Sequence, residues 1–337
     1  MKPIMSIIIP IYNAEQYIIK CFDSIRNQKV KEEIEIICID DGSTDRSRMI
    51  CDKYAKLDKR FKVFHKKNGG VSSARNLGLS VAKGKYIAWI DPDDYIADNW
   101  WDSIKFCLNL DVDILFFDYT IKRKNEFIRK SYSNKSGYIK KEEFLKEINR
   151  DNKIQNQLWS KIFKREIMKN IYFPETVSVM EDYAVLHKIV LNAKKIYYLS
   201  KTIYFYILRE NSLVNKKRDS MNFIKEKFYA YKIKKERYNF LKKYNYDVEK
   251  IEYLIQALIV CICYYKIYNK EKNNEFIMKR IIKMFNICKR EIKKNIMYIL
   301  RNREMSIIFK IKFLLFNIGI LKYFFIFRES IRKYKDF

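Results

Sequence analysis

Short apolar runs alternate with polar turns and helical segments through the first ninety residues of the chain. Residues 5–10 form a continuous apolar run, 34–39 and 86–90 are further apolar runs, as in strands that are buried on both faces, and 61–64 predict a short third strand. A helix after the first run places Ile18, Ile19, Phe22 and Ile25 on one face, and residues 47–57 predict a second helix. This alternation predicts an α/β fold with a mostly parallel central sheet flanked by helices.

Three carboxylates directly follow the fourth run, in the tetrapeptide Asp91-Pro92-Asp93-Asp94. Parallel sheets bind ligands beyond the carboxyl ends of their strands. Aspartates crowded there repel one another, and a divalent cation that also binds phosphate relieves that repulsion. The tetrapeptide therefore suggests a site for a metal ion and a diphosphate. An ordinary acidic turn, in which Pro92 fixes the backbone and Asp93 caps the next helix, explains the same residues.

Polar clusters also end the other runs. The segment 6–13 closes with Tyr12-Asn13, the second run is followed by the acidic turn 40–45, and Asn68-Gly69-Gly70 precedes the segment 74–78, Ala-Arg-Asn-Leu-Gly. In order and spacing, these segments and residues 90–94 resemble the family-2 glycosyltransferases. Four ordered motifs are far more specific than any one of them. The resemblance implies a GT-A fold that transfers sugar from a nucleotide diphosphate sugar with inversion.

The resemblance also implies a division of the chain, whose 337 residues suffice for one large domain and a smaller one. Residues 1–215 would form the GT-A domain, with a nucleotide-sugar-binding half at 1–100 and an acceptor half at 101–215. Residues 216–337 would form a helical extension.

Carried over position by position, the family's motifs imply donor-binding roles for residues at the strand ends. Pro10, Tyr12 and Asn13 would line the nucleotide pocket, with the Tyr12 ring lying against a uracil. Asp40 would accept a hydrogen bond from the base, and its neighbour Asp41 would help to hold the loop. A polar turn that caps the next helix is compatible with this role.

The glycine-rich turn is implied to face the diphosphate. Gly69 permits backbone conformations that a side chain would block, Asn68 is a companion polar group, and Arg75 would point its guanidinium toward the phosphates. The alternative is that Arg75 pairs with a carboxylate of residues 91–94 and holds the sheet edge together.

The resemblance further implies a Mn²⁺ or Mg²⁺ cofactor. Asp93 would be the principal metal ligand, with Asp91 contacting the ribose or sugar and the metal, and Asp94 would lie toward the acceptor. His65 follows a short strand among lysines and His187 lies within a predicted helix, so we interpret both histidines as structural.

A second acidic motif lies about ninety residues downstream, where Glu181-Asp182 opens a predicted helix. An inverting transfer needs a base for the acceptor hydroxyl, and Asp182, beside Glu181, is the implied base. Trp159 and Lys161 would border the acceptor or sugar pocket, and Lys161 with Arg209 would offset leaving-group charge. The alternative for Glu181 and Asp182 is that they only stabilise the positive N-terminal end of the helix dipole. The alternative for Trp159 is that its side chain packs in the hydrophobic core.

Charge and aromatic residues gather in the last part of the chain. The net charge is +29, and residues 201–337 hold 33 Lys and Arg against 13 Asp and Glu. Residues 307–327 combine a broad aromatic and aliphatic face with Lys310, Lys312 and Lys322, which predicts a helix lying on an anionic membrane surface rather than spanning it. A solvated helical tail is the alternative.

These features predict an enzyme of bacterial capsule, exopolysaccharide or O-antigen synthesis that moves a UDP-hexose or UDP-N-acetylhexosamine unit to a glycan, expected to be lipid-linked. Seven scattered cysteines and an N-terminus without a secretory signal indicate the cytosol, at the inner face of the membrane. Homo-oligomerisation stays open. A nucleic-acid-binding protein would leave the acidic motifs unexplained, and a sugar-nucleotide-binding pseudoenzyme would not need Glu181-Asp182.

Overall fold

The computed structural model describes residues 2–30, 34–124, 126–176, 180–209, 219–303 and 305–319. The chain divides into two compact units, Met1–Asn215 and Lys216–Phe337. Each unit has its own buried apolar core.

Within the described residues, unit 1 is built on one ten-stranded sheet whose main path runs β3-β2-β1-β4-β9-β6-β10-β5. The first four strands in the chain are β1 (Met5–Ile11), β2 (Ile34–Asp40), β3 (Phe61–His65) and β4 (Tyr86–Trp89). All their pairings with one another are parallel. Every residue of β1, β2 and β4 is buried, which explains the continuous apolar runs.

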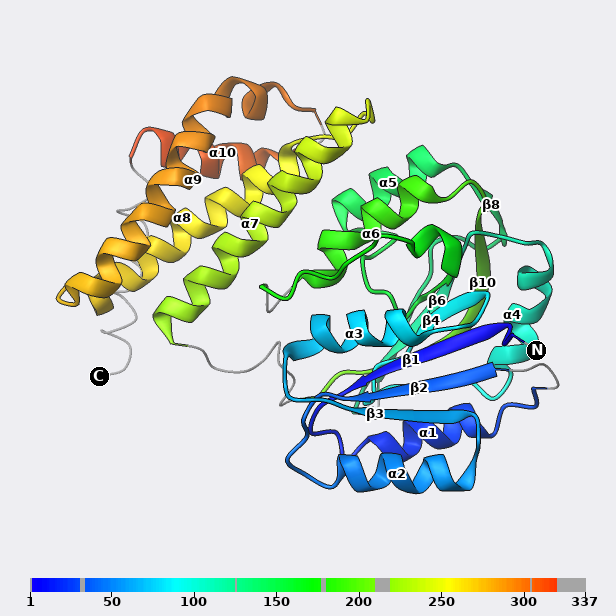
Figure 1. The fold of residues 1–337 in the computed structure, drawn as a ribbon. Coiled ribbons are helices and arrows are strands. Elements are labelled where there is room, and N and C mark those ends of the chain that lie inside the picture. The colour runs from blue at the N-terminus through cyan, green and yellow to red at the C-terminus, as the bar shows by residue number, and fades with distance from the viewer. Residues whose placement is uncertain are drawn as a thin grey trace. The chain divides into compact units, whose positions relative to one another are not determined.

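Helices cover both faces of this part of the sheet. Figure 1 shows α1 (Ile18–Arg26) and α2 (Ser47–Leu57) on one face and α3 (Gly70–Val81) on the other. Gly78 lets α3 lie close to β1, because a Cβ at this position would be 2.4 Å from Cγ2 of Ile8. The carboxyl ends of β1, β2 and β4 therefore open beside the first turn of α3.

The second half of unit 1 extends the sheet with antiparallel pairings. The strand β9 (Lys161–Lys164) runs antiparallel to both β4 and β6 (Ile114–Arg123), and β10 (Ile196–Ile207) runs parallel to β6. The remaining elements of this half are β5 (Tyr95–Ile96), β7 (Glu126–Lys130), β8 (Gly137–Ile139), α4 (Trp100–Asn109), α5 (Lys141–Arg150), the 3₁₀ helix η1 (Arg165–Met168) and α6 (Glu181–Asn192).

Unit 2 is helical throughout its described residues, with α7 (Ser220–Lys243), α8 (Ile251–Glu271), α9 (Glu275–Arg301) and α10 (Ile307–Asn317). Phe313 and Phe316 of α10 are buried in the core of this unit. Among the described helices, the segment 251–268 of α8 is long and apolar enough to cross a membrane, but 44% of it is buried inside the unit. Core helices of soluble proteins have the same length and composition, so one such segment is weak evidence for a span.

The predicted fold class is confirmed: a mostly parallel central sheet is flanked by helices, and further helices follow it. The prediction for the buried face of the first helix is wrong at one residue. Ile18, Cys21, Phe22 and Ile25 are buried, whereas Ile19 is 50% exposed. The residues of the predicted membrane helix beyond Gly319 lie outside the described residues.

Candidate active site

The carboxyl ends of β1 and β2 and the start of α3 enclose a cavity of about 620 Å³, which we call the Tyr12 cavity. Several predicted donor-binding residues line it, namely Pro10, Tyr12, Asn68 and Gly69. The side chain of Tyr12 is half exposed, so its ring is accessible to a ligand. Glu175 and Thr176 close the other side of the cavity.

Asp41 shapes the polar wall of the Tyr12 cavity. Its carboxylate accepts hydrogen bonds from the backbone N–H groups of Gly69, at 2.9 Å, and Gly70, at 2.7 Å, and from Nζ of Lys66 at 2.5 Å. Gly70 has a φ of 84°, a conformation that side chains disfavour. The turn therefore needs glycine and an acceptor from the neighbouring strand end, which agrees with the predicted loop-holding role of Asp41.

Asp40 and Asn13 lie just outside the cavity wall. Asp40 is buried, with Oδ2 2.9 Å from Nδ1 of His65 and Oδ1 accepting from the backbone N–H of Ser43 at 3.0 Å. Asn13 accepts a hydrogen bond from the backbone N–H of Thr44 at 2.8 Å. Asp41, not Asp40, faces the cavity, and the contact with Asp40 supports the structural role predicted for His65.

Arg75 joins the two acidic motifs at one point. Its Nη1 donates to Oε1 of Glu181 and to Oδ1 of Asp182, both at 2.7 Å, and its Nη2 lies 3.8 Å from Oδ1 of Asp91. The guanidinium is buried, and it bridges α3, the first turn of α6 and the loop after β4. The contact with Asp91 matches the predicted alternative of a carboxylate partner within residues 91–94, and the shorter contacts with the Glu181-Asp182 pair were not predicted.

The electrostatics of this cluster favour a base at Asp182. Burial raises the pKa of Asp182 to about 7, with Glu181 and Asp91 adding to the shift and the Arg75 guanidinium opposing it. Burial and Glu181 likewise raise the pKa of Asp91, again against Arg75. A carboxylate with a pKa near neutrality suits proton abstraction.

The side chains of Asp93 and Asp94 contact different residues. The Asp93 carboxylate contacts the guanidinium of Arg209, which lies 4.3 Å from the ring centroid of Tyr17. Asp94 is buried and accepts from the hydroxyl of Tyr204 and the backbone N–H of Ile207, both at 2.8 Å. Both oxygens of Asp94 are thus engaged in holding β10 beside the motif, which contradicts the predicted acceptor contact.

The residues present fit a divalent cation that arrives with a diphosphate. Asp91 and Asp93 are hard carboxylates, and both are partly accessible to solvent. Across the part of the chain that the structure describes, no group of three or more His, Cys, Asp or Glu could hold a metal ion. Mg²⁺ commonly binds through one or two carboxylates and completes its shell with substrate phosphates and water.

Trp159 and Lys161 are internal residues. Trp159 stacks on Tyr204 and Tyr206 with centroids 4.6 Å and 5.4 Å away, which matches the alternative of ordinary core. The Lys161 ammonium donates to the backbone carbonyls of Gln155 and Gln157 at 2.8 Å and 2.7 Å. Burial lowers the pKa of Lys161 to about 7. The Lys161 ammonium therefore bonds to its own loop, while its charge still acts on Asp182, and the predicted role at the border of the pocket stays a prediction.

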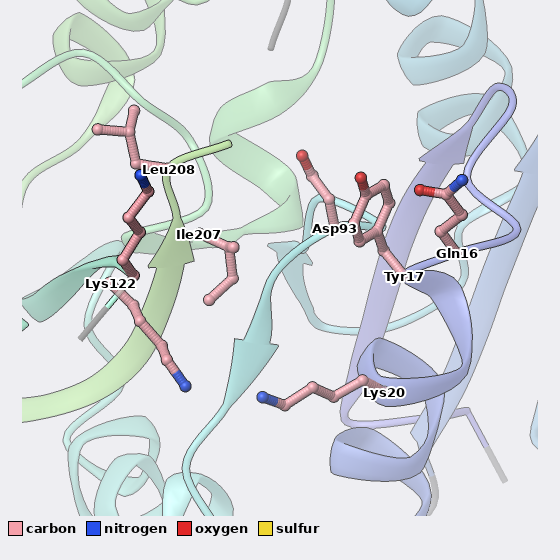
Figure 2. A pocket seen from close by; sticks show the side chains of 8 residues that line it. Gln16, Tyr17, Lys20, Asp93, Lys122, Ile207 and Leu208 are labelled. Atoms are coloured by element: carbon pink, nitrogen blue, oxygen red, sulfur yellow. The ribbon is translucent and has the colours of Figure 1, made fainter. Parts of the chain in front are cut away.

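A second cavity, of about 280 Å³, lies beside Asp93, and the sequence motifs did not predict it. We call it the lysine pocket. It is lined by residues from the start of α1 and the segment before it, from the loop between β4 and β5, and from the ends of β6 and β10: Gln16, Tyr17, Lys20, Asp93, Lys122, Lys124, Ile207 and Leu208. Figure 2 labels all of these residues except Lys124. No sequence motif marks these lysines, because Lys20 in α1 is about a hundred positions from Lys122 and Lys124 at the end of β6, and only the fold brings the two segments together.

Comparisons with known proteins show the family to which the chain is related. The family model described as Glycosyl transferase family 2 matches residues 6–177. EpsH of Bacillus subtilis (strain 168) is 30% identical over 224 residues, which cover 64% of this chain and 63% of EpsH. Poly(ribitol-phosphate) beta-glucosyltransferase of Bacillus spizizenii is 31% identical over 218 residues, which cover 61% of this chain and 32% of that protein.

The fold is shared with a solved structure. The crystal structure of S. aureus TarS 1-349 in complex with UDP-GlcNAc covers 99% of this chain and 92% of its own, with a TM-score of 0.63 and 23% sequence identity. The family model spans the strand-end motifs, the Tyr12 cavity and Arg75. The chain therefore belongs to glycosyl transferase family 2.

Proposed function

We propose that the chain is an inverting, metal-dependent transferase that moves a hexose or N-acetylhexosamine from a UDP-sugar to a hydroxyl group of a bacterial surface glycan. The observation that carries this proposal is Arg75, which brings Glu181 and Asp182 of the acceptor half to Asp91 of the donor half. A base and a phosphate-binding motif must meet in this way for one acceptor hydroxyl to attack the anomeric carbon. Residues 1–100 would bind the donor and residues 101–215 the acceptor.

The donor proposal rests on the Tyr12 cavity. Its exposed tyrosine ring can stack on a base, and the Asp41 wall presents the backbone of Gly69 and Gly70 toward the ligand. TarS, which shares the fold, is described in complex with UDP-GlcNAc, and this supports a UDP-sugar. Asp41 is in the better position to meet the base, while Asp40 supports the loop through His65.

In the proposed reaction, Asp182 takes the proton of the acceptor hydroxyl. Glu181 shares the Arg75 guanidinium with Asp182 and fixes its position. The Asp91 and Asp93 carboxylates would hold Mn²⁺ or Mg²⁺, which when bound offsets negative charge on the leaving diphosphate. Arg209, already in contact with Asp93, adds a second positive group near that charge.

Binding of UDP tests the donor site directly. Titration calorimetry should show that UDP binds in the presence of Mn²⁺. The variant Tyr12→Ala should have an affinity for UDP that is about 5- to 150-fold lower, because stacking of a base on an aromatic ring contributes roughly 1–3 kcal/mol. Tyr138→Ala, which removes a tyrosine of similar exposure on β8, is the matched control. No heat with UDP, with or without the metal, would remove the basis of the proposed function.

We also propose that unit 2 attaches the enzyme to the inner face of the cell membrane, where a lipid-linked acceptor would be found. In α10, the exposed apolar residues follow helical spacing and flank two lysines; they are Ile307, Ile308, Ile311, Leu314 and, just beyond the helix, Ile318. Such a face, with a basic surround, suits the headgroup region of an anionic bilayer.

Flotation with vesicles containing anionic lipid tests the attachment. The double variant I308E/I311E should lose most of its vesicle binding, because it places two charges on the proposed apolar face. The control F276E/M297E adds the same charge at exposed apolar positions of α9. Equal flotation of the two variants, or no flotation of the unchanged protein, would contradict attachment through α10.

A further inference from the structure

The lysine pocket is separate from the Tyr12 cavity and shares none of its lining residues. Lys20 comes from α1, and Lys122 lies opposite Ile207 where β6 pairs with β10. In Figure 2, the side chain of Lys20 extends from α1 toward the strands that carry Ile207 and Lys122. A nucleoside in the Tyr12 cavity therefore leaves these lysines available to a second ligand.

The pocket has an excess of positive charge. It is lined by three lysines and one carboxylate, Asp93, which already contacts Arg209. Within the described residues, neither Lys20 nor Lys122 has an ion-pair partner; their ammonium groups lie 3.6 Å and 5.3 Å from the ring centroids of Tyr95 and Phe127. Burial and the nearby charge of Lys122 both lower the pKa of Lys20. Because the charge of Lys122 acts on Lys20, an anion bound by both ammonium groups would relieve their repulsion.

A larger groove continues from the pocket. It is open, has a volume of about 760 Å³, and shares Lys20 as a lining residue. Its floor contains Tyr95 and Phe205, whose rings stack with centroids 4.7 Å apart and planes at 13°. Ser24, Asn99 and two carboxylates, Asp23 and Asp98, also line the groove, so the positive charge lies at its Lys20 end. The two cavities together can hold a charged group and an extended chain attached to it.

We propose that the lysine pocket binds a phosphate group of the acceptor, and that the acceptor is therefore a phosphate-bearing molecule rather than a neutral glycan. This inference rests on the proposed function, because it assigns the second substrate of the same site. Asp93 borders the pocket, so a phosphate held by Lys20 and Lys122 lies near the proposed donor diphosphate but outside the nucleotide cavity. The phosphate could belong to a polyol-phosphate chain or to the diphosphate of a lipid carrier.

Binding measurements with defined probes test the proposal. The probes are a glycerol-phosphate hexamer, geranyl diphosphate as a short, soluble lipid diphosphate, and neutral maltohexaose, each titrated by calorimetry into the full chain. The double variant K20Q/K122Q removes both charges. The control K53Q/K56Q makes the same change at two exposed lysines of α2. UDP with Mn²⁺ is titrated into all three proteins in parallel.

The unchanged protein should bind one of the two phosphate probes more tightly than maltohexaose, and the stronger probe identifies the source of the phosphate. K20Q/K122Q should weaken that binding by tenfold or more, since hydrogen bonds to charged groups are the strong ones, and K53Q/K56Q by less than twofold. The affinity for UDP should stay within twofold in both variants.

Three results would overturn the proposal. The first is no preference of the unchanged protein for a phosphate probe, and the second is equal weakening by the two double variants, which would indicate attraction by net charge alone. The third is a matching loss of UDP affinity in K20Q/K122Q, which would assign the lysines to the donor. If UDP fails to bind while the phosphate probe binds through Lys20 and Lys122, the proposed function fails and the phosphate site remains.

Discussion

Replacing Asp182 with asparagine should lower kcat by about 10²–10⁴-fold, because the amide cannot take the proton of the acceptor hydroxyl. Asparagine has almost the same shape and keeps an oxygen toward Arg75, so the variant should fold and melt like the unchanged enzyme. The measurement is steady-state turnover of a UDP-sugar, together with a thermal melt. Asp102→Asn, the same change at an exposed position in α4, should keep full turnover.

The pH dependence of kcat/KM in the unchanged enzyme is a second test of Asp182 as the base. Burial raises the pKa of Asp182 to about 7, and only the ionised carboxylate can act as a base. The value of kcat/KM should therefore fall about tenfold for each pH unit below 7 and level off above it. Asp182→Asn should remove this inflection from its residual activity. A variant that keeps most of its turnover, or keeps the inflection, would show that another group is the base.

Most of the first half of the fold could be predicted because burial on both faces leaves a direct signature. A strand in the middle of a covered parallel sheet has no polar face, so 5–10, 34–39 and 86–90 read as apolar runs; the exceptions, Ser6 and Glu35, are hydrogen-bonded to each other at 2.6 Å. Ile19 shows the limit of this argument. Whether an apolar residue at the edge of a helical face is buried depends on what packs there, and here Cys21 occupies the core while Ile19 lines an open groove.

The candidate site was predictable at the level of motifs but not of single side chains. Successive residues at a strand end point in opposite directions. Asp40 thus turns to His65 while Asp41 turns to the cavity. In the turn between β4 and β5, Asp93 contacts Arg209 while Asp94 is buried against Tyr204. Sequence gives the residue types in each pair, and only the local backbone decides which member faces a ligand.

Contacts between distant segments were the least predictable. Arg75 and Asp182 are 107 positions apart, and both are charged groups that a motif comparison assigns to separate substrates. The buried guanidinium pairs with the nearest carboxylates, as a buried charge must. The same argument applies to Lys161, whose chain position beside Trp159 gives no sign that its ammonium satisfies backbone carbonyls.

Removing divalent cations should lower turnover by at least about 10²-fold, and Asp93→Asn should have an effect of similar size. A cation at the leaving diphosphate contributes several kcal/mol, and each 1.36 kcal/mol corresponds to a factor of ten in rate. Asp93 is the carboxylate most suited to the metal, because its side chain is partly accessible to solvent and it borders the open lysine pocket. Turnover is measured after treatment with EDTA and again after adding Mn²⁺ or Mg²⁺.

The concentration of Mn²⁺ needed for half-maximal turnover separates a metal ligand from a residue that only holds Arg209. If Asp93 binds the ion, Asp93→Asn should need much more Mn²⁺, and saturating Mn²⁺ should restore part of its activity, whereas Asp102→Asn should titrate like the unchanged enzyme. If Asp93 serves only to hold Arg209, the variant should lose activity with an unchanged Mn²⁺ requirement. Full turnover in EDTA would exclude the metal, and the Asp91 and Asp93 carboxylates would then act through their arginine partners alone.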